Sequence, residues 1–99
     1  MCKKMTSKQR AYLRSLASRL DAIFQIGKSG ITDVFVEQIN DALEARELIK
    51  ISVLESAPDN TRNLGEEIAD KTNAILVQTM GNKITLYRAR KKNSKIVLP

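Results

Sequence analysis

The sequence predicts an α/β fold of the α+β kind, in which helices cover a four-stranded mixed sheet. Segments with helical periodicity alternate with short apolar runs of high β propensity, in the order α-β-α-β-α-β-β. The short strand–helix–strand links favour parallel neighbours, whereas Gly81-Asn82 between the last two runs predicts a hairpin and therefore an antiparallel strand. The chain has 99 residues, of which 42% are hydrophobic, so we expect one domain spanning residues 1–99.

Local capping signals predict where the first two helices begin. Thr6 and Gln9 have the spacing of a capping box, so the first helix is expected to begin near Ser7. Thr32 or Asp33 can cap the second helix. Both starts are therefore predicted from side chains that can accept hydrogen bonds from free amides of the first turn.

Apolar spacing predicts which face of each helix is buried. The expected buried residues are Leu13, Leu16, Ala17 and Leu20 in the first helix, Phe35, Ile39, Ala42 and Leu43 in the second, and Leu64, Ile68 and Ala69 in a third helix over residues 61–72. Gly65 lies inside the third helix, where it costs about 1 kcal/mol relative to alanine.

The predicted strands are residues 22–26, which form a short buried strand, and residues 47–54, 74–80 and 83–88. Residues 56–60 have the composition of a turn. Residues from about 91 to 99 are expected to form a loosely held basic tail.

Charge is distributed unevenly along the chain. Residues 1–28 contain seven bases and one acid, residues 29–82 four bases and ten acids, and residues 83–99 six bases and no acid. The formal net charges of the three parts are therefore +6, −6 and +6, which together give the overall +6. If the two basic ends meet in the fold, they form one positive face, as is typical of a polyanion-binding protein.

Composition excludes several classes of function. The chain has no histidine and one cysteine, which removes Ser-His-Asp and Cys-His catalysis, an internal disulfide and a multi-cysteine zinc site. Its carboxylates fall at the spacing of solvated helix faces, so we expect no enzyme, no metal and no cofactor. No apolar run approaches the ~18 residues of a membrane span, and the N-terminus lacks a signal-peptide core. We expect a cytoplasmic protein with neither a membrane nor a small molecule as its partner.

Gly27-Lys28-Ser29-Gly30 is the motif most suited to binding an anion. Two glycines allow a sugar-phosphate backbone to approach closely, and Lys28 adds a positive charge between them. The amides of Ser29, Gly30 and Ile31 would point outward at the positive end of the second helix. The GXXG loop of KH domains holds RNA backbone in this way. The alternative is a tight turn in which the glycines only supply unusual dihedral angles.

The four aromatic residues, Tyr12, Phe24, Phe35 and Tyr87, offer little for stacking on bases. Phe24 and Phe35 lie in apolar patterns and are expected in the core. Tyr12 and Tyr87 are expected as amphipathic edge residues, and stacking of either one on a base is the alternative. Backbone contacts are therefore favoured over base stacking.

Several stretches together resemble the CRM (chloroplast RNA splicing and ribosome maturation) domain, in its free-standing bacterial YhbY-like form. These are residues 6–10 (TSKQR), 24–30 (FQIGKSG), 42–50 (ALEARELIK) and 76–81 (LVQTMG), followed by Leu86-Tyr87-Arg88. The resemblance covers about residues 5–90, although residues 57–61 and the third helix match only loosely.

The resemblance implies an RNA-binding module whose sheet is similar to that of the C-terminal domain of translation initiation factor 3. It also implies association with ribosomal RNA of large-subunit precursors during assembly, while plant relatives use the domain in intron splicing. The family's GxxG loop corresponds to Gly27, Lys28, Ser29 and Gly30, and its first-helix cations to Lys8, Arg10 and Arg14.

The combined prediction is a ribosome assembly factor that binds RNA through a GxxG backbone clamp and a basic face. Residues 27–30, Lys8, Arg10, Arg14, Arg88 and Arg90 are the predicted RNA contacts. The alternative is a protein–protein interaction module that uses the acidic second and third helices, with basic ends that serve solubility.

Overall fold

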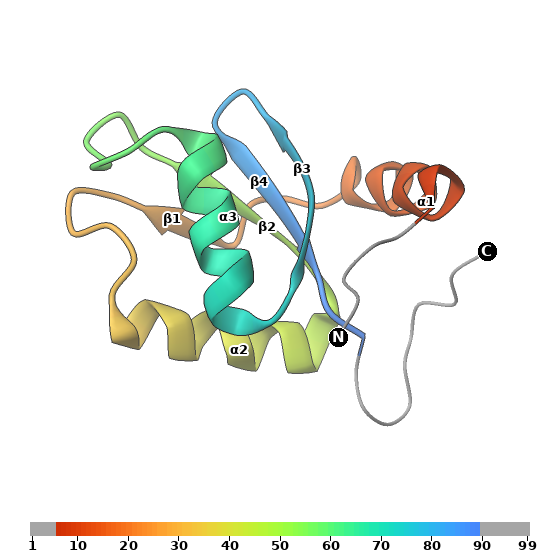
Figure 1. The fold of residues 1–99 in the computed structure, drawn as a ribbon, viewed down its shortest axis with the longest axis horizontal. Helices are drawn as coiled ribbons and strands as arrows, with labels where there is room; N and C mark the ends of the chain where they lie inside the picture. Colours follow the sequence, from red (N-terminus) through yellow and green to blue (C-terminus); the bar gives the residue numbers. More distant parts are fainter. Residues whose placement is uncertain (1–5, 90–99) are drawn as a thin grey trace.

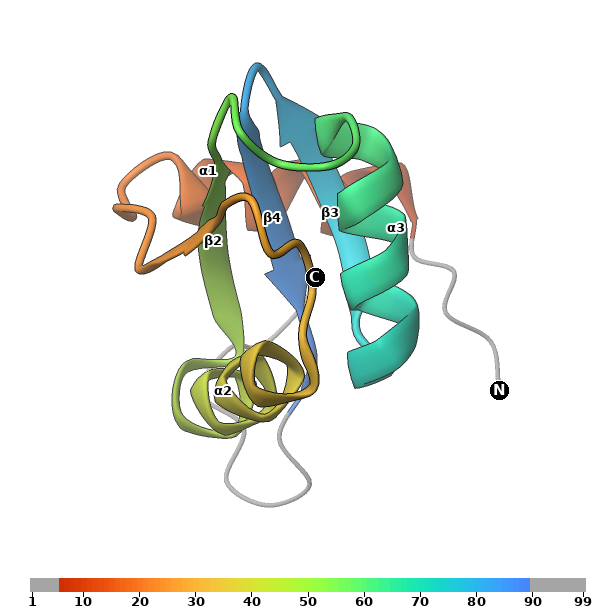
Figure 2. The same cartoon turned by 90° about the vertical axis from the view of Figure 1, so that its left-hand side faces the viewer.

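A computed structural model describes residues 6–89 and has the predicted order of elements (Figure 1). The helices are α1 (Ser7–Ala17), α2 (Asp33–Arg46) and α3 (Thr61–Thr72), and the strands are β1 (Phe24–Ile26), β2 (Leu48–Val53), β3 (Ile75–Met80) and β4 (Lys83–Tyr87). Helix α1 covers one face of the sheet, while α2 and α3 cover the other (Figures 1 and 2). The predicted α+β fold with a four-stranded mixed sheet is confirmed. The predicted tail over residues 91–99 lies outside the described residues.

The strand order is β1-β2-β4-β3. Strands β1 and β2 are parallel neighbours, as expected of a strand–helix–strand unit, and β4 is antiparallel to both β2 and β3. Strand β4 therefore lies between β2 and β3. The short link through α3 had favoured β2 and β3 as direct parallel neighbours, and that prediction was wrong. The predicted Gly81-Asn82 turn is present, and Gly81 has a φ of 59° that suits glycine.

The register brings three loops to one end of the sheet. Ile26 pairs with Val53, and Lys83 pairs with both Ser52 and Met80. The segments that follow these positions are residues 27–31, residues 54–60 and the turn at 81–82. The backbone amide of Val53 also donates to the Asn82 carbonyl at 2.7 Å, which joins the turn to the end of β2. Arg88 follows the opposite end of β4.

Two strand predictions were wrong in detail. The predicted buried strand at residues 22–26 is a three-residue edge strand in which only Ile26 is buried. An edge strand has a neighbour on one side only, so Phe24 and Gln25 keep solvent contact. Strand β2 lies between two helical layers and is buried on both faces, so the alternation expected of residues 47–54 is lost.

The predicted helix starts are confirmed, whereas two residues near the helix ends were misplaced. Thr6 forms the capping box with Gln9, and the Thr32 hydroxyl accepts a hydrogen bond from the Phe35 amide at 3.1 Å. Helix α1 ends at Ala17, so Leu20, which was predicted in the buried stripe, lies beyond the helix and is exposed. Glu47 is not the first strand residue but the fully buried C-cap of α2, with a φ of 65°.

Two apolar clusters hold the layers together. The larger one lies between the sheet and the α2–α3 layer and contains the predicted helix residues Phe35, Ile39, Leu43, Leu64, Ile68 and Ala69. The smaller one joins Leu13 and Ala17 of α1 to Leu48, Val77 and Tyr87 of the sheet. Gly65 has a packing role, since a β-carbon there would lie 3.1 Å from Leu76 Cδ1. Its cost to the helix is offset by close contact with the sheet.

Candidate nucleic-acid interface

The Gly27-Lys28-Ser29-Gly30 segment forms an exposed tight turn immediately before the capped start of α2. The Gly30 amide donates to the Gly27 carbonyl at 2.9 Å, and Gly30 has a φ of 67°. Lys28 and Ser29 therefore lie at the tip of the turn, and both side chains are exposed. The positive φ of Gly30 is consistent with the purely conformational explanation of this glycine.

The structure corrects one part of the predicted anion site. The Gly30 amide was expected to point outward, but it closes the turn and is not available to a ligand. The amides of Ser29 and Ile31 have no hydrogen-bond partner among residues 6–89. They lie just before the Thr32 cap, where the helix dipole favours an anion.

The turn is supported by the loop that follows β2. A β-carbon placed on Gly30 would lie 3.0 Å from Pro58 Cγ, so the two loops are in close contact. A β-carbon on Gly27 would lie 3.6 Å from Leu54 Cδ1, an ordinary van der Waals distance. Only Gly30 is therefore restricted to glycine both by its neighbours and by its dihedral angles.

Helix α1 presents cations to solvent on the other face of the sheet from α2 and α3. Lys8, Arg10 and Arg14 lie in this helix, which contains no acid, and the side chains of Lys8 and Arg14 are exposed. Neither Lys8 nor Arg14 forms an ion pair within the described part of the chain. Both are free to bind an anion.

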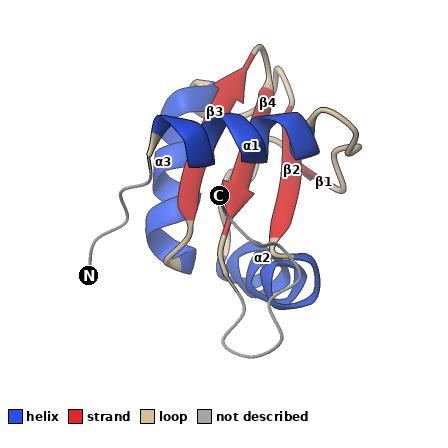
Figure 3. Cartoon of the chain, turned by 90° about the vertical axis from the view of Figure 1, so that its right-hand side faces the viewer, coloured by secondary structure: helices blue, strands red, loops and turns tan. Residues whose placement is uncertain are grey.

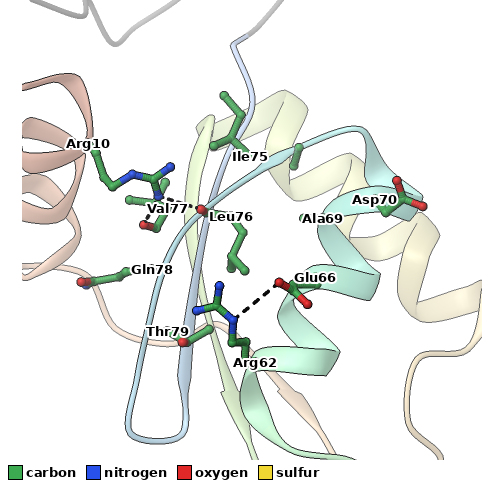
Figure 4. A pocket seen from close by; sticks show the side chains of 11 residues that line it. Arg10, Arg62, Glu66, Ala69, Asp70, Ile75, Leu76, Val77, Gln78 and Thr79 are labelled. Atoms are coloured by element: carbon green, nitrogen blue, oxygen red, sulfur yellow. Dashed lines mark hydrogen bonds and ion pairs between the residues drawn. The ribbon is translucent and has the colours of Figure 1, made fainter. Parts of the chain in front are cut away.

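Arg10 has an internal role that the sequence did not reveal. The β3–β4 register shifts between Leu76 and Gln78, which leaves Val77 in a β-bulge. Arg10 Nη1 donates to the Leu76 carbonyl at 2.9 Å and also to the Val77 carbonyl (Figure 4). The guanidinium therefore satisfies backbone oxygens at the bulge and fastens α1 to β3. It lies in a groove of about 550 Å³ that also contains the exposed Arg62–Glu66 ion pair.

Arg88 also makes internal contacts, at the end of the sheet remote from the Gly27–Gly30 turn. Its Nη1 donates to Asn40 Oδ1 and to the Thr72 carbonyl, both at 2.7 Å, and its Nη2 donates to the Asn40 carbonyl at 3.1 Å. These bonds join β4 to α2 and α3. The structure therefore does not bring Arg88 together with Lys28. Arg90, the other predicted contact of the C-terminal part, lies outside the described residues.

Exposed acids are concentrated on the α2–α3 layer, where they outnumber the exposed cations Arg46, Arg62 and Lys71. The acids Asp33, Glu37, Asp41 and Glu44 lie on α2, and Glu66, Glu67 and Asp70 lie on α3, all of them exposed. Helices α2 and α3 pack on the sheet face opposite α1 (Figure 3). The helices that carry these acids are therefore separated by the sheet from the helix that carries Lys8 and Arg14. An anionic ligand is therefore attracted to the α1 side.

Sequence reasoning missed one group of cations. Arg19 follows α1, Arg46 ends α2 and Lys50 lies in β2, yet all three line a pocket of about 280 Å³. Asp21 is the acid in the same lining. The three cations come from separate elements, so no local pattern could have identified the pocket.

The aromatic side chains are distributed largely as expected. Phe24 and Phe35 pack edge to face on each other, with ring centroids 6.1 Å apart, and both belong to or contact the larger apolar cluster. Tyr12 is exposed on α1, as expected of an edge residue. The same expectation for Tyr87 was wrong, because β4 is an inner strand and Tyr87 is only 4% exposed beneath α1. Among residues 6–89, no three His, Cys, Asp or Glu side chains are placed to hold a metal ion, and no helix is long and apolar enough to cross a membrane.

Comparison with known families matches residues 5–88 to the model of the CRS1 / YhbY (CRM) domain. The chain belongs to the CRM family. The match covers α1, the Gly27–Gly30 turn and all four strands, so the resemblance inferred from sequence motifs is confirmed.

Relatives of this CRM domain include short bacterial proteins and longer plant proteins. "Probable RNA-binding protein YqeI" from Bacillus subtilis is 46% identical over 95 residues, which cover 96% of this chain and 99% of that protein. An "RNA-binding protein" from Haemophilus influenzae is 33% identical, with 96% and 95% covered. "CRM-domain containing factor CFM2, chloroplastic" from Arabidopsis thaliana is 32% identical over 76 residues, which are 77% of this chain but 8% of that protein.

A solved structure has the same fold. The solution structure of the hypothetical protein SAV1595 from Staphylococcus aureus superposes with a TM-score of 0.81 at 48% sequence identity. The alignment covers 97% of this chain and all of the other. This chain therefore shares its architecture with the Staphylococcus aureus protein over nearly its whole length.

Proposed function

We propose that this CRM protein binds RNA as a non-catalytic protein, and that its target is ribosomal RNA of large-subunit precursors during assembly. The observation that carries the proposal is the separation of charge across the sheet, with Lys8 and Arg14 on α1 and seven exposed acids on the opposite layer. The names of the bacterial relatives support RNA as the ligand. The resemblance to the CRM family favours a ribosomal precursor as the RNA.

The mechanism is electrostatic and directed at the RNA backbone. Lys8, Arg14 and Lys28 neutralise phosphates and release counterions, which makes affinity depend steeply on salt. The free amides of Ser29 and Ile31 hold one further phosphate at the positive end of α2. Such contacts position the RNA without distinguishing its bases.

The decisive experiment reverses the charge at the tip of the turn. Lys28→Glu changes an exposed side chain, so the fold should persist, while binding to large-subunit ribosomal RNA should weaken about tenfold at moderate salt. Lys71→Glu is the matched control, because Lys71 is an exposed lysine on α3, in the opposite layer. Fluorescence anisotropy over a salt series measures both affinity and salt slope.

The target is tested separately. Crosslinking in cells followed by sequencing of the bound RNA should recover large-subunit ribosomal RNA, and the protein should sediment with precursor particles. Binding that survives RNase and high salt but is lost in Glu37→Lys would instead indicate a protein partner on the acidic helices.

A further inference from the structure

One row of side chains crosses all four strands on the α1 side of the sheet. Gln25 in β1 pairs with Ser52 in β2, Ser52 with Lys83 in β4, and Lys83 with Met80 in β3. These four residues are called the cross-sheet row below. The row lies directly before the sheet end from which the Gly27–Gly30 turn emerges, since the next pair of β1 and β2 is Ile26 with Val53.

The neighbours of the row fix the face on which it lies. Phe24, Ile26, Ile51, Val53 and Ile84 all pack in or against the core beneath α2 and α3, so the residues between or beside them point to the α1 side. Thr79 Cγ2 lies 3.4 Å from the position of a β-carbon on Gly65 of α3, so its neighbour Met80 also points to the α1 side.

Helix α1 leaves the two ends of this row open to solvent, whereas Ser52 inside it is buried with 7% of its surface exposed. The cluster beneath α1 involves Leu48, Val77 and Tyr87, which lie toward the other end of the sheet, and β3 and β4 continue past α1 toward their turn (Figure 3). Gln25 is exposed, Met80 is 66% exposed and Lys83 is half-buried. An antiparallel sheet commonly keeps one face toward water, and Gln25 and Lys83 give this end of the face its polar character.

The row offers hydrogen-bonding groups and positive charge. Lys83 Nζ donates to Ser52 Oγ at 2.7 Å, which holds the ammonium over the sheet with two N–H groups left for a ligand. Lys83 forms no ion pair with any residue of the described range 6–89, and the row contains no acid. The Gln25 carboxamide both donates and accepts, so it can pair with base edges as well as with phosphates.

We propose that the cross-sheet row is a second RNA contact, which binds the nucleotides next to those held by the Gly27–Gly30 turn and distinguishes their bases. This inference rests on the proposed function. Lys83 binds a phosphate, Gln25 hydrogen-bonds a base edge, and Met80 provides apolar contact at the β3 end. Recognition occurs by hydrogen bonds rather than stacking, because Phe24 faces the opposite core and Tyr87 is covered by α1.

Charge complementarity favours RNA over a protein as the occupant. The row lies on the same side of the sheet as Lys8 and Arg14 and borders Lys28, whereas the exposed acids of α2 and α3 lie on the far side. RNA that contacts the turn and then α1 would pass along this face. Extended single-stranded nucleotides suit it, because their bases are accessible to side chains.

The first experiment separates charge from base recognition. Lys83→Gln retains a donor for Ser52 but loses the charge, so the slope of log Kd against log salt should fall by about one, while Lys83→Arg should keep it. Gln25→Ala should reduce about fivefold the preference for selected large-subunit RNA over unrelated RNA of equal length. Matched controls in the opposite layer are Lys71→Gln on α3 and Gln38→Ala on α2, both at exposed positions.

A second experiment reads the contact directly in the wild-type protein. Amine-reactive labelling with mass spectrometry should show Lys83 protected by large-subunit RNA, with Lys71 labelled equally in the free and bound protein. This measurement does not depend on whether a variant folds.

The outcomes distinguish this inference from the proposed function. If Lys28→Glu weakens RNA binding while Lys83→Gln and Gln25→Ala bind as wild type and Lys83 is unprotected, the cross-sheet row is not an RNA contact although the clamp stands. If Lys28→Glu also binds as wild type, both proposals fail. If Lys83→Gln leaves RNA affinity unchanged but abolishes binding of an oligoglutamate peptide, the row binds acidic protein and the inference is overturned.

Discussion

The two faces of the sheet differ in how they are packed and in what they present to solvent. The face toward α2 and α3 is closed by a large apolar cluster, and the outer surfaces of both helices are acidic. The face toward α1 is joined to its helix by a small cluster, keeps a polar row partly exposed, and has cations along the helix. Stability is therefore expected to depend mainly on one face, and ligand binding on the other.

This difference has a physical origin. Burial of Gln25 and Lys83 against an apolar helix would take their polar groups out of water, whereas α1 packs where the sheet offers Leu48, Val77 and Tyr87. The face that α1 covers incompletely is the one on which we propose that RNA binds.

The largest expected effect is on the closed face. Ile68→Ala removes a fully buried side chain from the main cluster and should lower the free energy of unfolding by about 2–5 kcal/mol. RNA affinity of the folded protein should be unchanged.

Leu13→Ala on the α1 side should instead speed amide exchange in α1 first, with a smaller change elsewhere. Equal acceleration throughout the protein in Leu13→Ala would contradict the separation of the two clusters.

Removing the link between α1 and the bulge is expected to have the next largest effect. Arg10→Ala leaves the Leu76 and Val77 carbonyls without this donor and should cost about 1–3 kcal/mol in chemical denaturation. Arg14→Ala, on the same helix but exposed, should change stability by less than about 0.5 kcal/mol while weakening RNA binding. The comparison distinguishes a structural arginine from a ligand-binding one.

The glycine turn allows a sharper comparison between neighbouring positions. Gly30→Ala forces a β-carbon into a left-handed conformation beside Pro58 and should cost about 1–2 kcal/mol. Gly27→Ala has room and should stay within about 0.5 kcal/mol of wild type in thermal unfolding. Equal losses at the two positions would show that the turn geometry is misassigned.

The smallest effect on stability is expected at exposed lysines. Substitution of a lysine on either face should leave stability nearly unchanged, and only the lysine on the α1 side should affect RNA binding. Lys8→Gln should lower the salt slope of RNA binding by about one, whereas Lys71→Gln on α3 should not, and each should change stability by less than about 0.5 kcal/mol. Anisotropy over a salt series measures both slopes. A matching decrease in Lys71→Gln would mean that RNA does not discriminate between the faces.

Much of the fold could be predicted from the sequence because its signals are local. The capping box at Thr6, the cap at Thr32 and the Gly81-Asn82 turn each depend on residues within three positions of one another. The short β1 strand and the exposed Leu20 could not be predicted in this way, since both depend on where neighbouring elements end.

The candidate site was harder to predict because charge alone does not identify a partner. Lys8, Arg14, Lys28 and Ser29 are exposed as expected, whereas the guanidinium groups of Arg10 and Arg88 bind backbone oxygens that are distant in sequence. Leu76 is 66 residues from Arg10, so only the packed chain brings them together. The cationic pocket of Arg19, Arg46 and Lys50 was missed for the same reason.

The bulge at Val77 has a consequence for the spacing of positive charge on the surface. Side chains on a helix advance by about 100° per residue, so a slip of α1 by one position would take Arg10 away from the two carbonyls. Together with the packing of Leu13 and Ala17, the irregular pairing of one strand thus fixes the rotational setting of the helix. Because Lys8 and Arg14 belong to the same helix, the positions from which these two cations leave it follow from that setting.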